Sequence, residues 1–357
     1  MSLPLPGMRL FIRPLLLVAA AAVTLSAQTE QRTLTGDRVS IYNLAGTLRL
    51  EPGTAPRVGV TITRHGRDAA QLKIATGDVH GYNSLRIVYP SDRIVYPAMR
   101  SRGHTQLRVN SDGTFDDNEG GGWFSRRDQV QISGSGQGLE AYADVVVTIP
   151  RGQRIVVHWG VGDANVANVD GDVRVSVAGA RVTAQHTRGK LSLDTGSGEV
   201  SVTDADGDVT LDTGSGGVMV SHIHGDALLM DTGSGSIAGG DIDVRTLKTD
   251  VGSGGLHLDH IKSRTAAVDA GSGGVELQFD STVDNVSAES GSGGVTVRLP
   301  GTQGGDVDIE SGSGGLETDF PVSSTRFERN HVRGRIGNGN ARIRIETGSG
   351  NARLLKN

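Results

Sequence analysis

The stretch LDTGSGEVSV, residues 193–202, contains the pattern that organises most of this chain. Its Gly-Ser-Gly triplet begins at Gly196 and returns with first glycines at 214, 233, 252, 271, 291, 312 and 348. The first seven triplets follow one another at intervals of 18 to 21 residues. Repetition at a fixed period of this length is the sequence signature of an architecture built from stacked repeats.

Apolar and polar residues alternate on both sides of each triplet. Leu191 and Leu193 precede the first triplet, and Val200 follows it. The matching positions of the next two copies are Val209, Leu211, Val218, Leu228, Met230 and Ile237. Because a period of two indicates a strand with one buried face, each repeat reads as strand, Gly-Ser-Gly corner, strand and second corner.

A two-stranded unit of this size cannot bury its own apolar face, whereas stacked copies can. We therefore predict an all-β fold: a parallel β-solenoid, or β-helix, of coils of about 19 residues with two main strands per coil. The composition favours a thin core of small side chains, since the chain has 53 glycines and only 4% aromatic residues.

The first 27 residues have the features of a signal peptide. Arg9 and Arg13 precede an apolar run over 15–25, and Ser26-Ala27 supplies small residues for cleavage. The run is shorter than the roughly 20 residues that a membrane span needs, although an uncleaved anchor remains the alternative. We expect an exported protein, periplasmic or secreted to the cell surface, with no membrane span after signal removal.

The rest of the chain divides into two regions. Residues 28–150 predict an irregular β region with an insertion near 75–130, and residues 151–357 predict the solenoid with a C-terminal cap. The cap is expected because Gly337-Asn338-Gly339 precedes the last triplet by only 11 residues, too few for a full coil. Arrays of this kind need their open ends closed.

Three stretches resemble the bacterial DUF4097 family. They are the triplet-punctuated strands, the lead-in ADVVVTIPRGQRIVVHWGVGDANVANVDGDVRV (143–175) and the ending GNGNARIRIETGSGNARL (337–354). The resemblance spans roughly 33–357 and is strongest over 143–357. It implies a β-strand repeat fold, an envelope or secreted setting and an adhesin-like role. The family supplies no catalytic residues to carry over.

The tetrapeptide Asp194-Thr195-Gly196-Ser197 also occurs around the catalytic aspartate of pepsin-like proteases. Such an enzyme brings two aspartates together to share a proton, whereas here graded copies lie one coil apart. We interpret the motif as a structural corner, in which glycines relax the backbone and the aspartate accepts backbone N–H bonds. The predicted turn residues are Asp194, Gly196, Ser197, Gly198, Asp212, Gly214, Ser215, Gly216, Asp231, Gly233, Ser234 and Gly235.

The acidic residue before each triplet forms a column of its own. Its members are Asp194, Asp212, Asp231, Asp250, Asp269, Glu289, Glu310 and Glu346. Stacked carboxylates repel one another unless they are exposed, bonded to the turn or bound to cations. We favour exposed, turn-bonded acids and no cofactor. Calcium is the alternative, although the calcium-binding nonapeptide of β-rolls is not matched.

Two further columns alternate acid and base if the coils stack in register. The first contains Asp204, His222, Asp241 and His260, and the second contains Asp206, His224, Asp243 and Lys262. We interpret them as a surface charge ladder. A zinc site at His222, Asp241 and His260 is the alternative, because imidazole and carboxylate are suitable ligands.

An enzyme on a β-helix needs a cleft, and the coils from 196 to 293 leave no room for long loops. The insertion is the one place that could supply a site, through His104, Asp112, Asp116, Asp117, Trp123, Arg126 and Arg127. We favour a solvated polar loop there.

We therefore predict a non-enzymatic, adhesin-like scaffold that presents a repetitive surface to a surface glycan or an envelope protein. The alternatives are a carbohydrate-active lyase or hydrolase and a periplasmic partner in envelope-stress signalling. The net charge of −5 and the lack of a basic patch argue against nucleic acid. The absence of cysteine excludes disulfides and thiolate metal sites.

Overall fold

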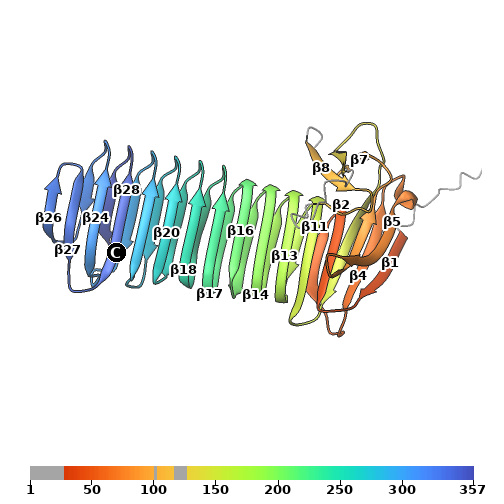
Figure 1. Ribbon diagram of the computed structural model, residues 1–357, viewed down its shortest axis with the longest axis horizontal. Coiled ribbons are helices and arrows are strands. Elements are labelled where there is room, and N and C mark those ends of the chain that lie inside the picture. Colours follow the sequence, from red (N-terminus) through yellow and green to blue (C-terminus); the bar gives the residue numbers. More distant parts are fainter. Residues whose placement is uncertain (1–27, 100–102, 116–126) are drawn as a thin grey trace, which may run out of the picture.

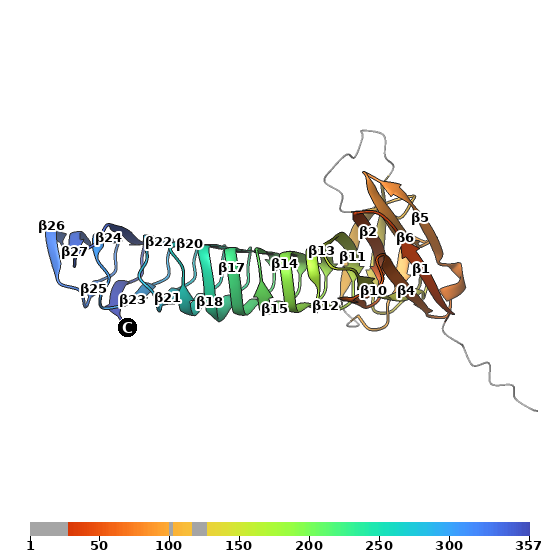
Figure 2. The same ribbon diagram turned by 90° about the horizontal axis from the view of Figure 1, so that it is seen from below.

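The computed structural model describes residues 28–99, 103–115 and 127–357. These residues form strands joined by turns, with a single 3-10 turn at η1 (Ala69–Gln71). The strands stack into an elongated solenoid that extends away from a wider N-terminal region (Figures 1 and 2). The predicted all-β parallel solenoid with two main strands per coil is confirmed.

The strand that precedes each Gly-Ser-Gly triplet lies beside the matching strand of the next coil, and together they form what we call the pre-turn sheet. Its parallel pairing is in register, as in Leu193 opposite Leu211 and Leu211 opposite Met230. Its strands are β13 (Asp170–Gly179), the second half of β14 (Val182–Ser197), β16 (Val209–Ser215), the second halves of β17 (Val218–Thr232) and β18 (Ile237–Val251), β20 (Thr265–Ala270), β22 (Asn285–Ser290), β28 (Ala341–Thr347) and β24 (Gly305–Ser311).

The strands that follow the turns form the second sheet, the post-turn sheet. Val200 lies opposite Val218, and Val218 opposite Ile237. This sheet contains β12 (Ala164–Ala167), the first halves of β14, β17 and β18, β15 (Val200–Asp206), β19 (Leu256–Lys262), β21 (Val275–Phe279), β23 (Val295–Leu299), β29 (Ala352–Lys356) and β25 (Leu316–Thr318).

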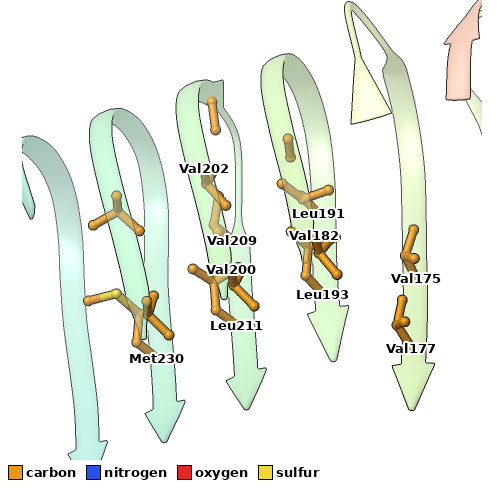
Figure 3. Close-up of a cluster of buried hydrophobic side chains, with 14 of the residues drawn as sticks. Val175, Val177, Val182, Leu191, Leu193, Val200, Val202, Val209, Leu211 and Met230 are labelled. Atoms are coloured by element: carbon orange, nitrogen blue, oxygen red, sulfur yellow. The ribbon is translucent and has the colours of Figure 1, made fainter. Parts of the chain in front are cut away.

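The core is the narrow space between the two sheets. Leu193 and Leu211 from the pre-turn sheet face Val200 and Val202 from the post-turn sheet, and all four are at most 1% exposed (Figure 3). Each coil contributes mainly valine, leucine, isoleucine or alanine, so equivalent side chains stack along the axis. This explains how a chain so poor in aromatic residues buries a continuous core.

The N-terminal strands continue both sheets. The pre-turn sheet extends through β11 (Gln153–Val161), β2 (Arg38–Ala45), β6 (Tyr82–Val88) and β5 (Lys73–Val79). The post-turn sheet extends through β3 (Leu48–Pro52), β10 (Tyr142–Ile149), β4 (Val58–His65) and β1 (Gln28–Leu34). A separate three-stranded sheet contains β7 (Arg93–Val95), β8 (His104–Asn110) and β9 (Arg127–Ser133).

The C-terminal end is built differently from the expected closing unit. Strands β28 and β29, which follow Gly337, lie between the coil of β22 and β23 and the coil of β24 and β25. The antiparallel hairpin of β26 (Val322–Glu328) and β27 (His331–Ile336) continues the pre-turn sheet beyond β24 instead. The order of the coils in space therefore differs from their order in the sequence. Strands β24 to β27 form the end of the array, and β28 and β29, which follow them in the chain, lie one coil further in.

Candidate functional site

The glycine at the third position of each triplet is required by the close approach of successive coils. A Cβ placed on Gly273 would lie 1.5 Å from the carbonyl oxygen of Gly254, and one on Gly254 would lie 1.8 Å from that of Gly235. The fourth position differs, because a Cβ on Gly274 would meet its nearest atom, the carbonyl oxygen of Gly294, only at 3.7 Å. Steric fit between coils thus explains the glycine at the third position of the triplet, but not a glycine at the position that follows it.

At four of the corners, the side chain that crosses the turn is the hydroxyl after the acid. Thr232 Oγ1 accepts a hydrogen bond from the Gly235 N–H at 3.0 Å and donates to the Gly216 carbonyl of the previous coil at 3.2 Å. Ser290, Ser311 and Thr347 make the same pair of bonds. The sequence predicts the aspartate as the acceptor across the corner, and the residue after the acid is threonine or serine at six of the eight positions.

The acidic side chains stack on the outer face of the pre-turn sheet. Asp212 lies opposite Asp231, which lies opposite Asp250, and the column continues through Asp269 and Glu289. Burial and the neighbouring carboxylates of Asp212 and Asp250 raise the pKa of Asp231 above its usual range. Burial, Asp250 and Glu289 do the same for the pKa of Asp269.

The first alternating column occupies an unusual backbone position. Asp204, His222, Asp241 and His260 all have positive φ, as do Asn168 and His186 at the preceding positions of the same column, and the six values lie between 49° and 57°. The pairing skips each of these residues, since Thr203 and Ala205 pair with the next coil but Asp204 does not. Each is therefore a left-handed kink that these coils share, at which the register between them is kept and the inward alternation shifts by one residue.

The residues at these kinks place their side chains outward in one line. His222 Nδ1 lies 3.7 Å from Asp204 Oδ1, and His222 Nε2 lies 3.6 Å from Asp241 Oδ2. His260 Nδ1 lies 3.0 Å from Asp280, whose hydrogen bond and charge raise the pKa of His260. Asp204 also meets His186 at 3.4 Å, so acid and base alternate along the line.

The second alternating column runs beside the first, two residues further along each strand. Asp206 lies opposite His224, His224 opposite Asp243 and Asp243 opposite Lys262. Asp206 contacts both His224 Nδ1 and Arg188 Nε at 3.3 Å. The hydrogen bond from His224, with the help of Arg188, holds the pKa of Asp206 below its usual range despite some desolvation.

The geometry gives no support to the metal candidates. Within the described residues, no group of three or more His, Asp or Glu side chains lies close enough together to hold an ion. This applies to His222, Asp241 and His260 and equally to the acidic column considered for calcium. His222 and Asp241 approach as an ion pair with both side chains more than half exposed.

The insertion residues are distributed over several places. His104 begins β8 and lines a cleft of about 740 Å³ between the insertion and the first coils. Asp112 is partly buried, yet hydrogen bonds from Thr114 and the charge of Arg86 lower its pKa. Arg127 begins β9. Asp116, Asp117, Trp123 and Arg126 lie outside the described residues.

The cleft between the insertion and the first coils, which we call the junction cleft, is lined by several polar groups. Its lining includes Tyr96, Asp163, Arg181 and Glu199. Burial, together with the charges of Asp144 and Asp163, raises the pKa of Tyr96 to about 12. Arg181 Nε lies 3.7 Å from Glu199 Oε2, so these two charged side chains are paired with each other.

A second depression follows the solenoid itself and was missed by sequence analysis. This coil groove has a volume of about 650 Å³ and crosses consecutive coils of the post-turn sheet. Its lining includes the fourth-position residues Ser236, Gly255, Gly274, Gly294 and Asn351 and the outward side chains Ala238, His257, Glu276, Thr296 and Arg353. The sequence feature that could have indicated this groove is the glycine that directly follows the triplet in several coils.

The stacked coils, their equal lengths and their repeated charged columns define a β-solenoid repeat protein. The chain belongs to the DUF4097 family, whose model, described as Toastrack DUF4097, matches residues 141–355. No curated protein matches the chain. The region described by the structure contains no helix long and apolar enough to cross a membrane.

Two solved structures are similar. One is a putative cell adhesion protein from Clostridium sporogenes, with 10% identity and a TM-score of 0.21, covering 93% of this chain and 100% of that one. The other is a putative adhesin from Parabacteroides distasonis, with 13% identity and a TM-score of 0.36, covering 92% of this chain and 98% of that one.

Proposed function

We propose that this protein is an exported, non-enzymatic scaffold that binds an extended glycan or an envelope protein along the coil groove. The observation that carries the proposal is the groove itself. In successive coils, the residue after the triplet forms its floor, and the outward side chain two residues later forms its wall. A repeated groove suits a repeated ligand, because each coil can make one weak contact and the contacts add by multivalency.

The chemistry of the groove favours a polar chain molecule. Its floor is open at Gly255 and Gly274, where backbone atoms are accessible to a ligand. Its wall offers hydrogen-bonding and charged groups from His257, Glu276 and Arg353, and His257 Nδ1 lies 3.1 Å from Glu276 Oε2. Such a surface provides donors and acceptors of both signs.

Binding to a glycan array, followed by calorimetry with the best ligand, tests this proposal. Gly274→Gln places a long side chain on the floor and is expected to weaken binding at least tenfold. Gly217→Gln is the matched control, because a Cβ there also meets its nearest atom only at 3.7 Å and Gly217 does not line the groove. Equal binding by both variants would contradict a site in the groove.

The alternative, a carbohydrate-active enzyme, is favoured only by the junction cleft with its carboxylates and imidazole. Incubating the purified protein with uronic-acid polymers and neutral glycans, and measuring new reducing ends or unsaturated products, distinguishes the two. Turnover that is lost in Glu199→Gln would establish an enzyme and overturn the scaffold proposal. We expect no turnover, because Glu199 is already paired with Arg181.

A further inference from the structure

Strand β26 forms the outermost rung of the pre-turn sheet at the C-terminal end (Figures 1 and 2). It pairs with β27 along one edge, and within the described residues no strand pairs with its other edge. Every residue of β26 after Val322 is exposed. An open edge of this kind is a template for pairing with another strand.

Phe327 is the most exposed large apolar residue of the described chain, at 79%. It lies opposite Val332, which is buried, and residues directly opposite in a sheet share a face. Phe327 therefore projects from the face that elsewhere covers the core. It is uncovered because the post-turn sheet ends at β25, a strand of only three residues.

The backbone of Phe327 is also directed toward the open edge. Glu328 and His331 flank a two-residue turn, so this pair exchanges the hydrogen bonds that close the hairpin. Hydrogen-bonded and non-hydrogen-bonded pairs alternate in an antiparallel ladder. The N–H and carbonyl groups of Phe327 consequently point away from β27, where another strand can bind them.

The charges beside Phe327 are self-complementary. Arg326 and Glu328 share the opposite face of the strand and contact each other at 2.8 Å. In an antiparallel two-fold pairing centred on Phe327, Arg326 lies opposite Glu328 of the second copy, and Glu328 lies opposite its Arg326. Opposite charges in directly facing positions stabilise a sheet, whereas like charges destabilise it.

We propose that two copies of this protein associate end to end through antiparallel pairing of their β26 strands, centred on Phe327. The pairing satisfies the free backbone groups of Phe327, places the two phenyl rings side by side and forms two cross-strand ion pairs. It converts two solenoids into one rod with a continuous pre-turn sheet. The occupant of the open edge is a second copy because the edge complements itself in sequence and charge.

A single introduced cysteine tests the register, since the chain has none of its own. Hydrogen-bonded antiparallel partners have Cα atoms about 5.5 Å apart, within the range of a disulfide. Phe327→Cys is expected to give a disulfide-linked dimer under mild oxidation. Met219→Cys is the control, because Met219 is 53% exposed in the middle of the array. Equal cross-linking of the two variants, or none, would overturn the proposal.

Sedimentation of charge variants tests the association without a covalent bond. The unmodified protein is expected to dimerise at micromolar concentration. Arg326→Glu alone sets like charges opposite each other at both cross-strand pairs and is expected to weaken the dimer about tenfold. The double variant Arg326→Glu, Glu328→Arg is expected to restore it. A monomer at every concentration, or a double variant as weak as the single one, contradicts the pairing.

Discussion

The hydroxyl of Ser290 donates a hydrogen bond of 2.8 Å to the carbonyl oxygen of Gly273, one coil away. Ser290 Oγ also accepts a hydrogen bond of 2.9 Å from the N–H of Gly293 within its own turn. One buried hydroxyl thus closes a corner and joins it to the neighbouring corner. The repeated Gly-Ser-Gly motif is therefore a joint between coils as well as a turn within each coil.

Removing that hydroxyl should weaken the solenoid. Ser290→Ala leaves a partly buried N–H and a partly buried carbonyl without this partner, and we expect a loss of about 1–2 kcal/mol in the free energy of unfolding. The measurement is the midpoint of urea unfolding followed by circular dichroism.

The neighbouring coil supplies the control, because Ala270 naturally stands at the same position. Ala270→Ser adds a hydroxyl that can reach Gly254 and Gly273 and should not lower the midpoint. An unchanged midpoint for Ser290→Ala would show that the hydroxyl does not join the coils.

Adjacent glycines should respond in opposite ways to the same substitution. Gly273→Ala places a Cβ 1.5 Å from a backbone oxygen, so the coils must separate, and we expect a loss of at least about 3 kcal/mol. Gly274→Ala meets its nearest atom at 3.7 Å and should change stability by less than about 0.5 kcal/mol. Thermal unfolding of the two variants checks the difference, and similar values would exclude steric fit as its cause.

Much of the solenoid could be predicted from the sequence because its physics is local and repeated. The inward positions of Leu193 and Val200 follow from alternation, and the facing of Asp206 and His224 follows from coil length. Both predictions need only a period of two within a strand and equal spacing between coils.

Other features could not be predicted, because the repeat pattern does not determine the backbone conformation at each position or the order in which the coils stack. Asp204 indicates positive φ more weakly than glycine would, and the kink there is visible only in the pairing that skips this residue. The pairing of β28 with β22 is equally invisible in the sequence. Repeats with the same columns can stack in more than one order, so their order along the chain does not fix their order in space.

The stacked acids should make stability depend on pH. The pKa of Asp231 is raised by burial and by Asp212 and Asp250, so the folded state binds more protons than the unfolded state just above the ordinary pKa of 3.8. Stability then falls as pH rises through that window. Asp231→Asn should therefore be more stable than the parent at pH 7, by about 0.5 kcal/mol, and no more stable at a pH well below 3.8.

Asp206 provides the opposite case. Its pKa is lowered, mainly by the hydrogen bond with His224, so its contribution to stability is present above its ordinary pKa and is lost as pH falls through the lowered value. Asp206→Asn should therefore be less stable than the parent at pH 7. Urea midpoints of the two variants across the acid range test both signs. A gain in stability for both at pH 7 would mean that net charge, rather than position, controls the effect.

The line of positive-φ residues predicts which side chains His222 can be replaced by. An L-residue in the left-handed region costs roughly 1–2 kcal/mol, most for β-branched side chains, whereas glycine and asparagine adopt it readily. His222→Gly and His222→Asn should stay within about 0.5 kcal/mol of the parent, and His222→Val should lose about 1–2 kcal/mol in urea unfolding.

His224→Val is the matched control, because His224 is exposed two residues further along the strand and does not have positive φ. If both valine variants lose the same amount, the cost arises from the lost ion pairs. A loss confined to position 222 identifies the left-handed backbone as the reason that Asp, Asn and His alternate along this column.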